Sequence, residues 1–259
     1  MIDSHAHITE ERLAPQIGRI VSDMESDGLH AVIEVGCDRT TSEQAAELAA
    51  ENGRIFALVG THPEFAADYG DAEAETYARL AAMPKVVGIG EIGLDYYYET
   101  PPGDIQKKAF VAQLELAHAL SMPVALHIRD AYGDLLGILK DNSAYVKDGL
   151  LMHCYSGSAD FVRELAAFDA YFAFGGAVTF KNAKKRDVIR AVPKDRLLVE
   201  TDCPYMTPVP FRGTLNEPKY VRHTLAFVAD ALGMSFEETE RLTENNTLTL
   251  FPKMKAFLE

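Results

Sequence analysis

Short apolar runs rich in β-branched residues alternate along this chain with longer amphipathic segments. Eight of these runs are predicted to be strands, and most are followed by a turn and a helix-like segment. Their ranges are Met1–His5, Ala31–Gly36, Ile55–Gly60, Val86–Glu91, Pro123–Ile128, Gly149–His153, Tyr171–Gly176 and Arg196–Thr201. Nearly continuous apolar strands are typical of a parallel sheet that helices cover. The pattern therefore predicts an α/β fold.

The length of the chain and its final segments narrow this fold to one architecture. A chain of 259 residues fits a single (β/α)8 TIM barrel, and no Ser/Gly- or Pro-rich linker divides residues 1–259. Two further helical segments, Lys219–Leu232 and Glu237–Phe251, are expected to close the bottom or the side. An open doubly wound sheet would show the same alternation. In a barrel, however, catalytic residues come from the carboxyl ends of many different strands, and the candidate residues of this chain are distributed in that way.

Local signals predict where several helices begin. Thr40–Glu43 and Ser235–Glu238 both have the Ser/Thr-x-x-Glu form of a capping box. The segment Gln106–Leu120 carries an apolar stripe at helical spacing, which is typical of a core-facing helix. The stripe consists of Phe110, Leu114, Ala117 and Leu120.

Candidate metal ligands stand at the ends of five predicted strands. His5 and His7 are separated by one residue, so both project to the same side of an extended segment. The full set is His5, His7, Glu91, His127, His153 and Asp202. Mixed nitrogen and oxygen donors suit zinc, manganese, iron or nickel better than calcium. Six ligands exceed the three that a catalytic ion normally takes from protein, so we expect two divalent ions, with Mg, Mn and Zn as candidates.

Within this set, two carboxylates are predicted to be catalytic. Glu91 is expected to bridge the two ions, and Asp202 to hold a metal and accept a proton from the nucleophilic water.

Substrate contacts are predicted nearby, each with a plainer alternative. Arg129 and Tyr155 share the strand faces of ligand histidines, although Arg129 could equally form a structural ion pair. His62, in a turn after the third strand, could contact a phosphate or only stabilise its loop. The basic run Lys181–Arg186 lies where many barrels bind phosphate, yet such runs are usually solvated helix faces.

Composition limits the partners and the compartment. The formal charge of −14 argues against a broad electrostatic grip on nucleic acid or an anionic membrane. The segment Gly88–Gly93 matches a dinucleotide-binding fingerprint, but a loop rather than a helix follows it, so no nucleotide cofactor is expected. The chain shows no secretory signal and no apolar run of spanning length, and its three cysteines lack metal-site spacing. These features predict a cytoplasmic enzyme, which we expect to be a monomer.

Taken together, the strand-end motifs resemble those of the TatD family of metal-dependent deoxyribonucleases. The matching pieces are Asp3–His7, Gly60–Pro63, Gly90–Tyr96, His127–Ala131, His153–Gly157, Glu200–Tyr205, Arg212–Gly213 and Asn216–Pro218. The resemblance implies a TIM barrel, divalent metals and hydrolysis of DNA phosphodiesters, in some members as a 3′→5′ exonuclease on single-stranded ends. It places the metal ions on the six candidate ligands and adds Arg212 as a substrate contact.

Two other functions fit the same residues. One is metal-dependent hydrolysis of another bond, such as a cyclic amide, a lactone or an aminoacyl ester, because a fold alone does not choose the reaction. Glu91 favours the nuclease, since amide-hydrolysing relatives often carry a modified lysine there. The other is a non-catalytic protein that binds metal or a partner, which the intact ligand set disfavours.

Overall fold

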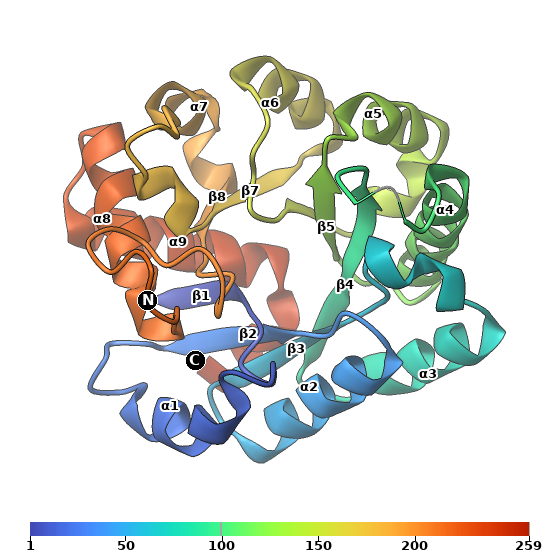
Figure 1. Cartoon of the computed structure of the whole chain (residues 1–259), viewed down its shortest axis with the longest axis horizontal. Helices are drawn as coiled ribbons and strands as arrows, with labels where there is room; N and C mark the ends of the chain where they lie inside the picture. Colours follow the sequence, from blue (N-terminus) through green and yellow to red (C-terminus); the bar gives the residue numbers. More distant parts are fainter. Residues whose placement is uncertain (99, 259) are drawn as a thin grey trace.

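The computed structural model describes residues 1–98 and 100–258, and these form a (β/α)8 barrel (Figure 1). Eight parallel strands pair in chain order from first to last. They are β1 (Ile2–Ala6), β2 (Ala31–Val35), β3 (Ile55–Val59), β4 (Val86–Asp95), β5 (Val124–Arg129), β6 (Leu150–Met152), β7 (Tyr171–Phe174) and β8 (Leu197–Val199). The predicted fold class is therefore confirmed, and only β4 runs clearly further than predicted.

Backbone hydrogen bonds close the barrel just beyond the paired strands. Asp202 N donates to His5 O at 2.9 Å, and His7 N donates to Cys203 O at 2.8 Å. The first and last strands are thereby joined at their carboxyl ends, so that residues far apart in sequence meet there.

Helices surround the strands on the outside of the barrel (Figure 1). They are α1 (Ile17–Asp23), α2 (Arg39–Glu51), α3 (Asp71–Ala81), α4 (Gly103–Ala119), α5 (Tyr132–Asp141), α6 (Ala159–Leu165), α7 (Arg186–Ala191), α8 (Val221–Leu232), α9 (Phe236–Leu250) and α10 (Lys255–Leu258). In α4, the predicted stripe residues Phe110, Leu114 and Ala117 are buried. No helix among the described residues is long and apolar enough to cross a membrane.

One predicted helix start is right and one is wrong. Ser235 caps α9 through its hydroxyl, which accepts a hydrogen bond from Glu238 N at 3.1 Å. In α2, however, the N-cap is Asp38, whose carboxylate accepts from Thr41 N at 2.7 Å. Aspartate is as good a cap as serine, so the helix begins before the predicted box, and Thr40 lies within it.

The interior of the barrel has its own apolar core, and the C-terminal segment closes it. Phe56, Leu58 and Leu198 point inward and pack with Phe251 and Met254, which follow α9. Leu250, the last residue of α9, lies against Gly149, which directly precedes β6, so the C-terminal segment closes the bottom, one of the two expected positions. The carboxyl ends of the strands remain for the functional site.

Candidate metal centre

The six predicted ligands converge at the carboxyl end of the barrel. They come from β1, from the middle of β4, from β5 and from the turns after β6 and β8. Glu91 is the hub of the cluster, because its two carboxylate oxygens face different groups of imidazoles. It is 3% exposed, so the cluster lies inside the protein rather than on its surface.

One oxygen of Glu91, Oε2, faces His5 and His7. Oε2 lies 3.3 Å from His5 Nε2 and 3.6 Å from His7 Nε2. The two Nε2 atoms are 3.2 Å apart, as their shared strand face predicted. Asp202 completes this side, with Oδ1 3.5 Å from His7 Nε2.

The other oxygen of Glu91 faces three further histidines. Oε1 lies 2.7 Å from His127 Nδ1 and 3.0 Å from His153 Nε2. His62, predicted only as a substrate contact, is also here, with Nε2 3.8 Å from Oε1. One carboxylate thus joins two groups of nitrogen donors, which is the arrangement expected of a bridging ligand.

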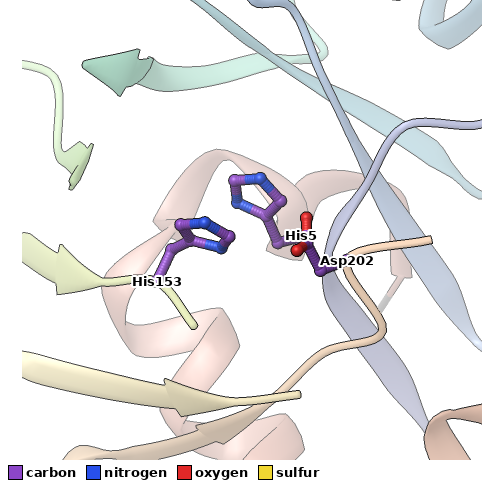
Figure 2. A group of neighbouring side chains, drawn as sticks. All are labelled: His5, His153 and Asp202. Atoms are coloured by element: carbon purple, nitrogen blue, oxygen red, sulfur yellow. The ribbon is translucent and has the colours of Figure 1, made fainter. Parts of the chain in front are cut away.

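The spacing of the donor atoms fits divalent cations. Three groups have one donor per residue, all within 4.8 Å of one another: His5, His153 and Asp202 (Figure 2); His5, His7 and Glu91; and His62, Glu91 and His127. Two nitrogen ligands of one tetrahedral zinc ion lie about 3.4 Å apart, given bonds of about 2.1 Å. Moreover, Nδ1 of the fully buried His5 has no hydrogen-bond partner among the described residues.

Electrostatics favour ionised carboxylates in this cluster. Burial would raise the pKa of Glu91, but the imidazoles of His153 and His5 outweigh it and hold that pKa well below its ordinary value. Burial also opposes ionisation of Asp202, yet its contact with His7 leaves the pKa lowered. Burial and the nearby His127 lower the pKa of His62 to about 3. At neutral pH both carboxylates are therefore ionised, and His62 is neutral, with Nδ1 accepting a hydrogen bond from Glu64 N at 3.2 Å.

Burial also opposes protonation of the other histidines, yet neighbouring acidic groups raise the pKa of His7 and His153 and raise that of His127 to about 9. A bound metal ion would therefore displace protons from these three rings.

A second layer of acceptors orients the histidines. His7 Nδ1–H donates to Val35 O at 2.9 Å, which leaves Nε2 free to face the cluster. Asp95 Oδ2 lies 2.9 Å from His127 Nε2, so Nδ1 of that ring faces Glu91. Sequence reasoning did not assign Asp95 a role, because the predicted fourth strand ended at Glu91, whereas β4 extends to Asp95.

Glu200 orients the last histidine of the cluster and was also missed. Its Oε1 lies 3.1 Å from His153 Nδ1 and accepts a hydrogen bond from Cys154 N at 2.7 Å. Glu200 is fully buried at the end of β8, so it faces the barrel interior rather than solvent. Its place directly before Thr201 and Asp202 was the available sequence signal.

The predicted substrate contacts lie at different distances from the cluster. Arg129, partly buried, lies with its guanidinium carbon 3.7 Å from the ring centroid of Tyr97. Lys181 and Arg212 are exposed, and the Arg212 guanidinium carbon is 4.3 Å from the ring centroid of Phe180. These three cations therefore lie around the entrance rather than at its floor.

The prediction that Tyr155 lines the pocket is wrong. Its side chain is 2% exposed and packs in the core, with its ring 4.9 Å from that of Phe172, while its hydroxyl donates to Ser158 O at 2.7 Å. Strand alternation fails here because β6 ends at Met152 and Cys154 has a left-handed φ of 42°. The ring is thereby turned away from the side of His153.

Known proteins share this architecture along nearly the whole chain. The family described as TatD related DNase matches residues 2–252. An uncharacterized metal-dependent hydrolase, YabD of Bacillus subtilis, is 41% identical over 252 residues, covering 97% of this chain and 98% of that protein. A Klebsiella pneumoniae protein named 3′-5′ ssDNA/RNA exonuclease TatD is 33% identical over 257 residues, covering 97% of each.

A solved structure agrees with both the sequence matches and the fold. The crystal structure of YjjV, a TatD homologue from Escherichia coli K12, superposes with a TM-score of 0.91 at 28% identity. The superposition covers 97% of this chain and 98% of that one. Together with the strand-end cluster of imidazoles and carboxylates, these matches show that the chain belongs to the TatD family of metal-dependent hydrolases.

Proposed function

We propose that this enzyme hydrolyses phosphodiester bonds of DNA, shortening single-stranded ends in the 3′→5′ direction with two divalent ions. The observation that carries the proposal is the position of Glu91 between two groups of imidazoles. A Klebsiella pneumoniae relative bears the name of a 3′-5′ ssDNA/RNA exonuclease, which supports the same substrate and polarity.

Metal ions in such a pair neutralise charge on a transferring phosphoryl group and acidify water. His5, His7, Glu91, His127, His153 and Asp202 would hold them. His62 lies beside Glu91, and its Nε2–H could donate a hydrogen bond to the phosphate.

The remaining chemistry falls to ionised side chains. Asp202 stays ionised at neutral pH, so its carboxylate can accept a proton from the attacking water. Arg129 lies at the end of β5 beside the entrance, where its guanidinium could pair with a phosphate oxygen of the substrate. Lys181 and Arg212, farther out, would contact phosphates of the strand outside the barrel.

A metal add-back assay tests the proposal. Purified protein is stripped with a chelator and incubated with 5′-labelled single-stranded DNA plus Mg, Mn or Zn. We expect stepwise shortening of the labelled strand with at least one ion, and its loss in Glu91→Gln and Asp202→Asn. Glu47→Gln, which changes an exposed carboxylate on α2, is the matched control and should cut like the native chain.

Two results would contradict the proposal. Cleavage by Glu91→Gln at a rate near that of the control would remove the bridging role. An absence of cleavage with every ion, in protein that still binds metal, would redirect the assignment to a lactone, a cyclic amide or an aminoacyl ester.

A further inference from the structure

Exposed apolar side chains gather at the same end of the barrel as the metal cluster. Among the described residues, seven large apolar side chains are exposed: Phe65, Tyr97, Tyr98, Tyr205, Val209, Phe211 and Phe257. All but Phe257 lie in the loops that follow β3, β4 and β8. Loops after strands form the rim of the functional end of a barrel, so these side chains surround the entrance.

Three of these residues, all tyrosines, contact an arginine, and they form two separate groups; the first contains two of them. Tyr97 and Tyr98 follow β4, are 57% and 53% exposed, and hold their ring centroids 4.9 Å apart. The guanidinium carbon of Arg129 lies 3.7 Å from the Tyr97 centroid and 5.4 Å from that of Tyr98. We name this group the β4 clamp.

The β4 clamp is connected to the metal cluster through a single carboxylate. Tyr97 N donates to Asp95 Oδ1 at 2.8 Å, while Asp95 Oδ2 lies 2.9 Å from the ring of His127. The backbone at Tyr97 is therefore anchored beside the proposed metal ligands, while the rings of both tyrosines face solvent.

A second group, the β8 clamp, consists of Tyr205 and Arg12. Tyr205 is 46% exposed, and the guanidinium carbon of Arg12 lies 4.7 Å from its ring centroid. Its ring is 6.4 Å from that of His7, and Tyr205 N donates to Asp202 O at 3.0 Å. This clamp is thus also anchored to the cluster.

The two clamps stand on opposite sides of the entrance. Strands pair in chain order around the barrel, so the end of β8 beside β1 is across from β4 and β5 (Figure 1). The metal cluster lies between them, since His7 touches one clamp and Asp95 with His127 touches the other.

We propose that the two clamps stack unpaired nucleobases on either side of the phosphodiester presented to the metal cluster. An aromatic ring stacks on any base, and an adjacent guanidinium adds attraction to base and phosphate. A guanidinium beside an exposed ring favours a ligand that combines flat rings with phosphates; Arg129 offers this at the β4 clamp, whereas Arg12 at the β8 clamp also pairs with Glu10 at 2.8 Å. This inference rests on the proposed nuclease function and specifies what the entrance recognises.

Equilibrium binding tests the clamps independently of cleavage. The probe is a fluorescent oligothymidylate with a phosphorothioate backbone, which resists hydrolysis, compared with an abasic oligomer of the same backbone on metal-loaded protein. We expect the native protein to prefer the base-bearing oligomer. Tyr205→Ala and the pair Tyr97→Ala/Tyr98→Ala should each reduce that preference about 5- to 150-fold, the loss expected for one stacked base.

Matched variants separate stacking from other effects. Tyr205→Phe keeps the ring and should keep the preference, whereas Phe257→Ala removes an exposed ring outside the entrance and should change neither affinity. If the alanine variants keep the full preference for the base-bearing oligomer, or if the native protein has none, the proposed base stacking is wrong. The nuclease proposal would then still be decided by the cleavage assay alone. Base preference without any cleavage would instead retain the clamps and reject the nuclease.

Discussion

At the scale of single residues, the site depends on carboxylates that hold other side chains. Glu91 faces both groups of imidazoles, while Asp95 and Glu200 lie behind His127 and His153. Groups of this second kind set the orientation and basicity of histidine ligands without touching the ion. The chain therefore devotes three buried acids to positioning as well as to binding.

Glu200 provides a test of this positioning role. Replacing it with Gln keeps the shape but removes the charge facing His153 Nδ1, so we expect metal affinity to fall about 10- to 100-fold. Competition with a fluorescent chelator measures that affinity directly. Asp195→Asn, at an exposed aspartate, is the control, and equal affinities for the two variants would contradict the role.

Single residues also mark where sequence reasoning succeeded and where it failed. His5 and His7 could be paired in advance because both rings lie on one side of the extended segment, with their Nε2 atoms 3.2 Å apart. Tyr155 could not be placed, because the left-handed Cys154 reverses the expected side. His62 was separated from the ligands because its nearness to Glu91 depends on how β3 and β4 lie side by side.

At the scale of elements, the apolar pattern located all eight strands but not their exact ends. The extension of β4 to Asp95 falls in a stretch with glycine and aspartate, which has no strand preference of its own. Pairing with β5 extends this strand, with Asp95 opposite Arg129. Contacts between strands decide such ends, and a single sequence does not report them.

The segment after α9 offers a test of how the barrel is stabilised. Phe251 is fully buried and packs against Leu58 and other inward residues. We expect Phe251→Ala to lower the free energy of unfolding by about 3–5 kcal/mol, because it leaves a cavity in this core. Urea denaturation measures the change.

The neighbouring Phe257 supplies the comparison for that variant. It is 43% exposed and its ring lies 5.9 Å from that of Phe56, so Phe257→Ala should cost about 1 kcal/mol, clearly less than Phe251→Ala. If both substitutions cost the same, Phe251 would not be the closing residue of the barrel interior.

At the scale of the whole molecule, charge is distributed unevenly. The net charge is −14, yet Arg12, Arg129, Lys181 and Arg212 all lie in or beside the loops at the carboxyl end of the strands. Overall composition predicted a weak general attraction to nucleic acid. The fold adds that these four cations lie at the end of the barrel that holds the cluster, which composition could not reveal.

The salt dependence of binding tests this distribution. Lys181 and Lys184 are exposed, whereas Lys185 donates to Gly157 O at 3.0 Å and supports a loop. Replacing the first two with Ala should reduce the slope of log affinity against log salt for single-stranded DNA by about 1.4, or about 0.7 per phosphate contact.

A charge-matched pair at the other end of the barrel controls for net charge. Lys147 and Lys194 are exposed and precede β6 and β8, so their replacement changes the total charge equally. An identical reduction in slope for both pairs would attribute the effect to overall charge rather than to the basic run.

The closed amino end of the barrel restricts how substrate enters and product leaves. Among the described residues, Phe251 and Met254 fill the amino end, so the cluster is open to solvent only at the carboxyl end of the barrel. Whatever reaches Glu91 must leave by the route it took, and a polymer cannot be threaded through.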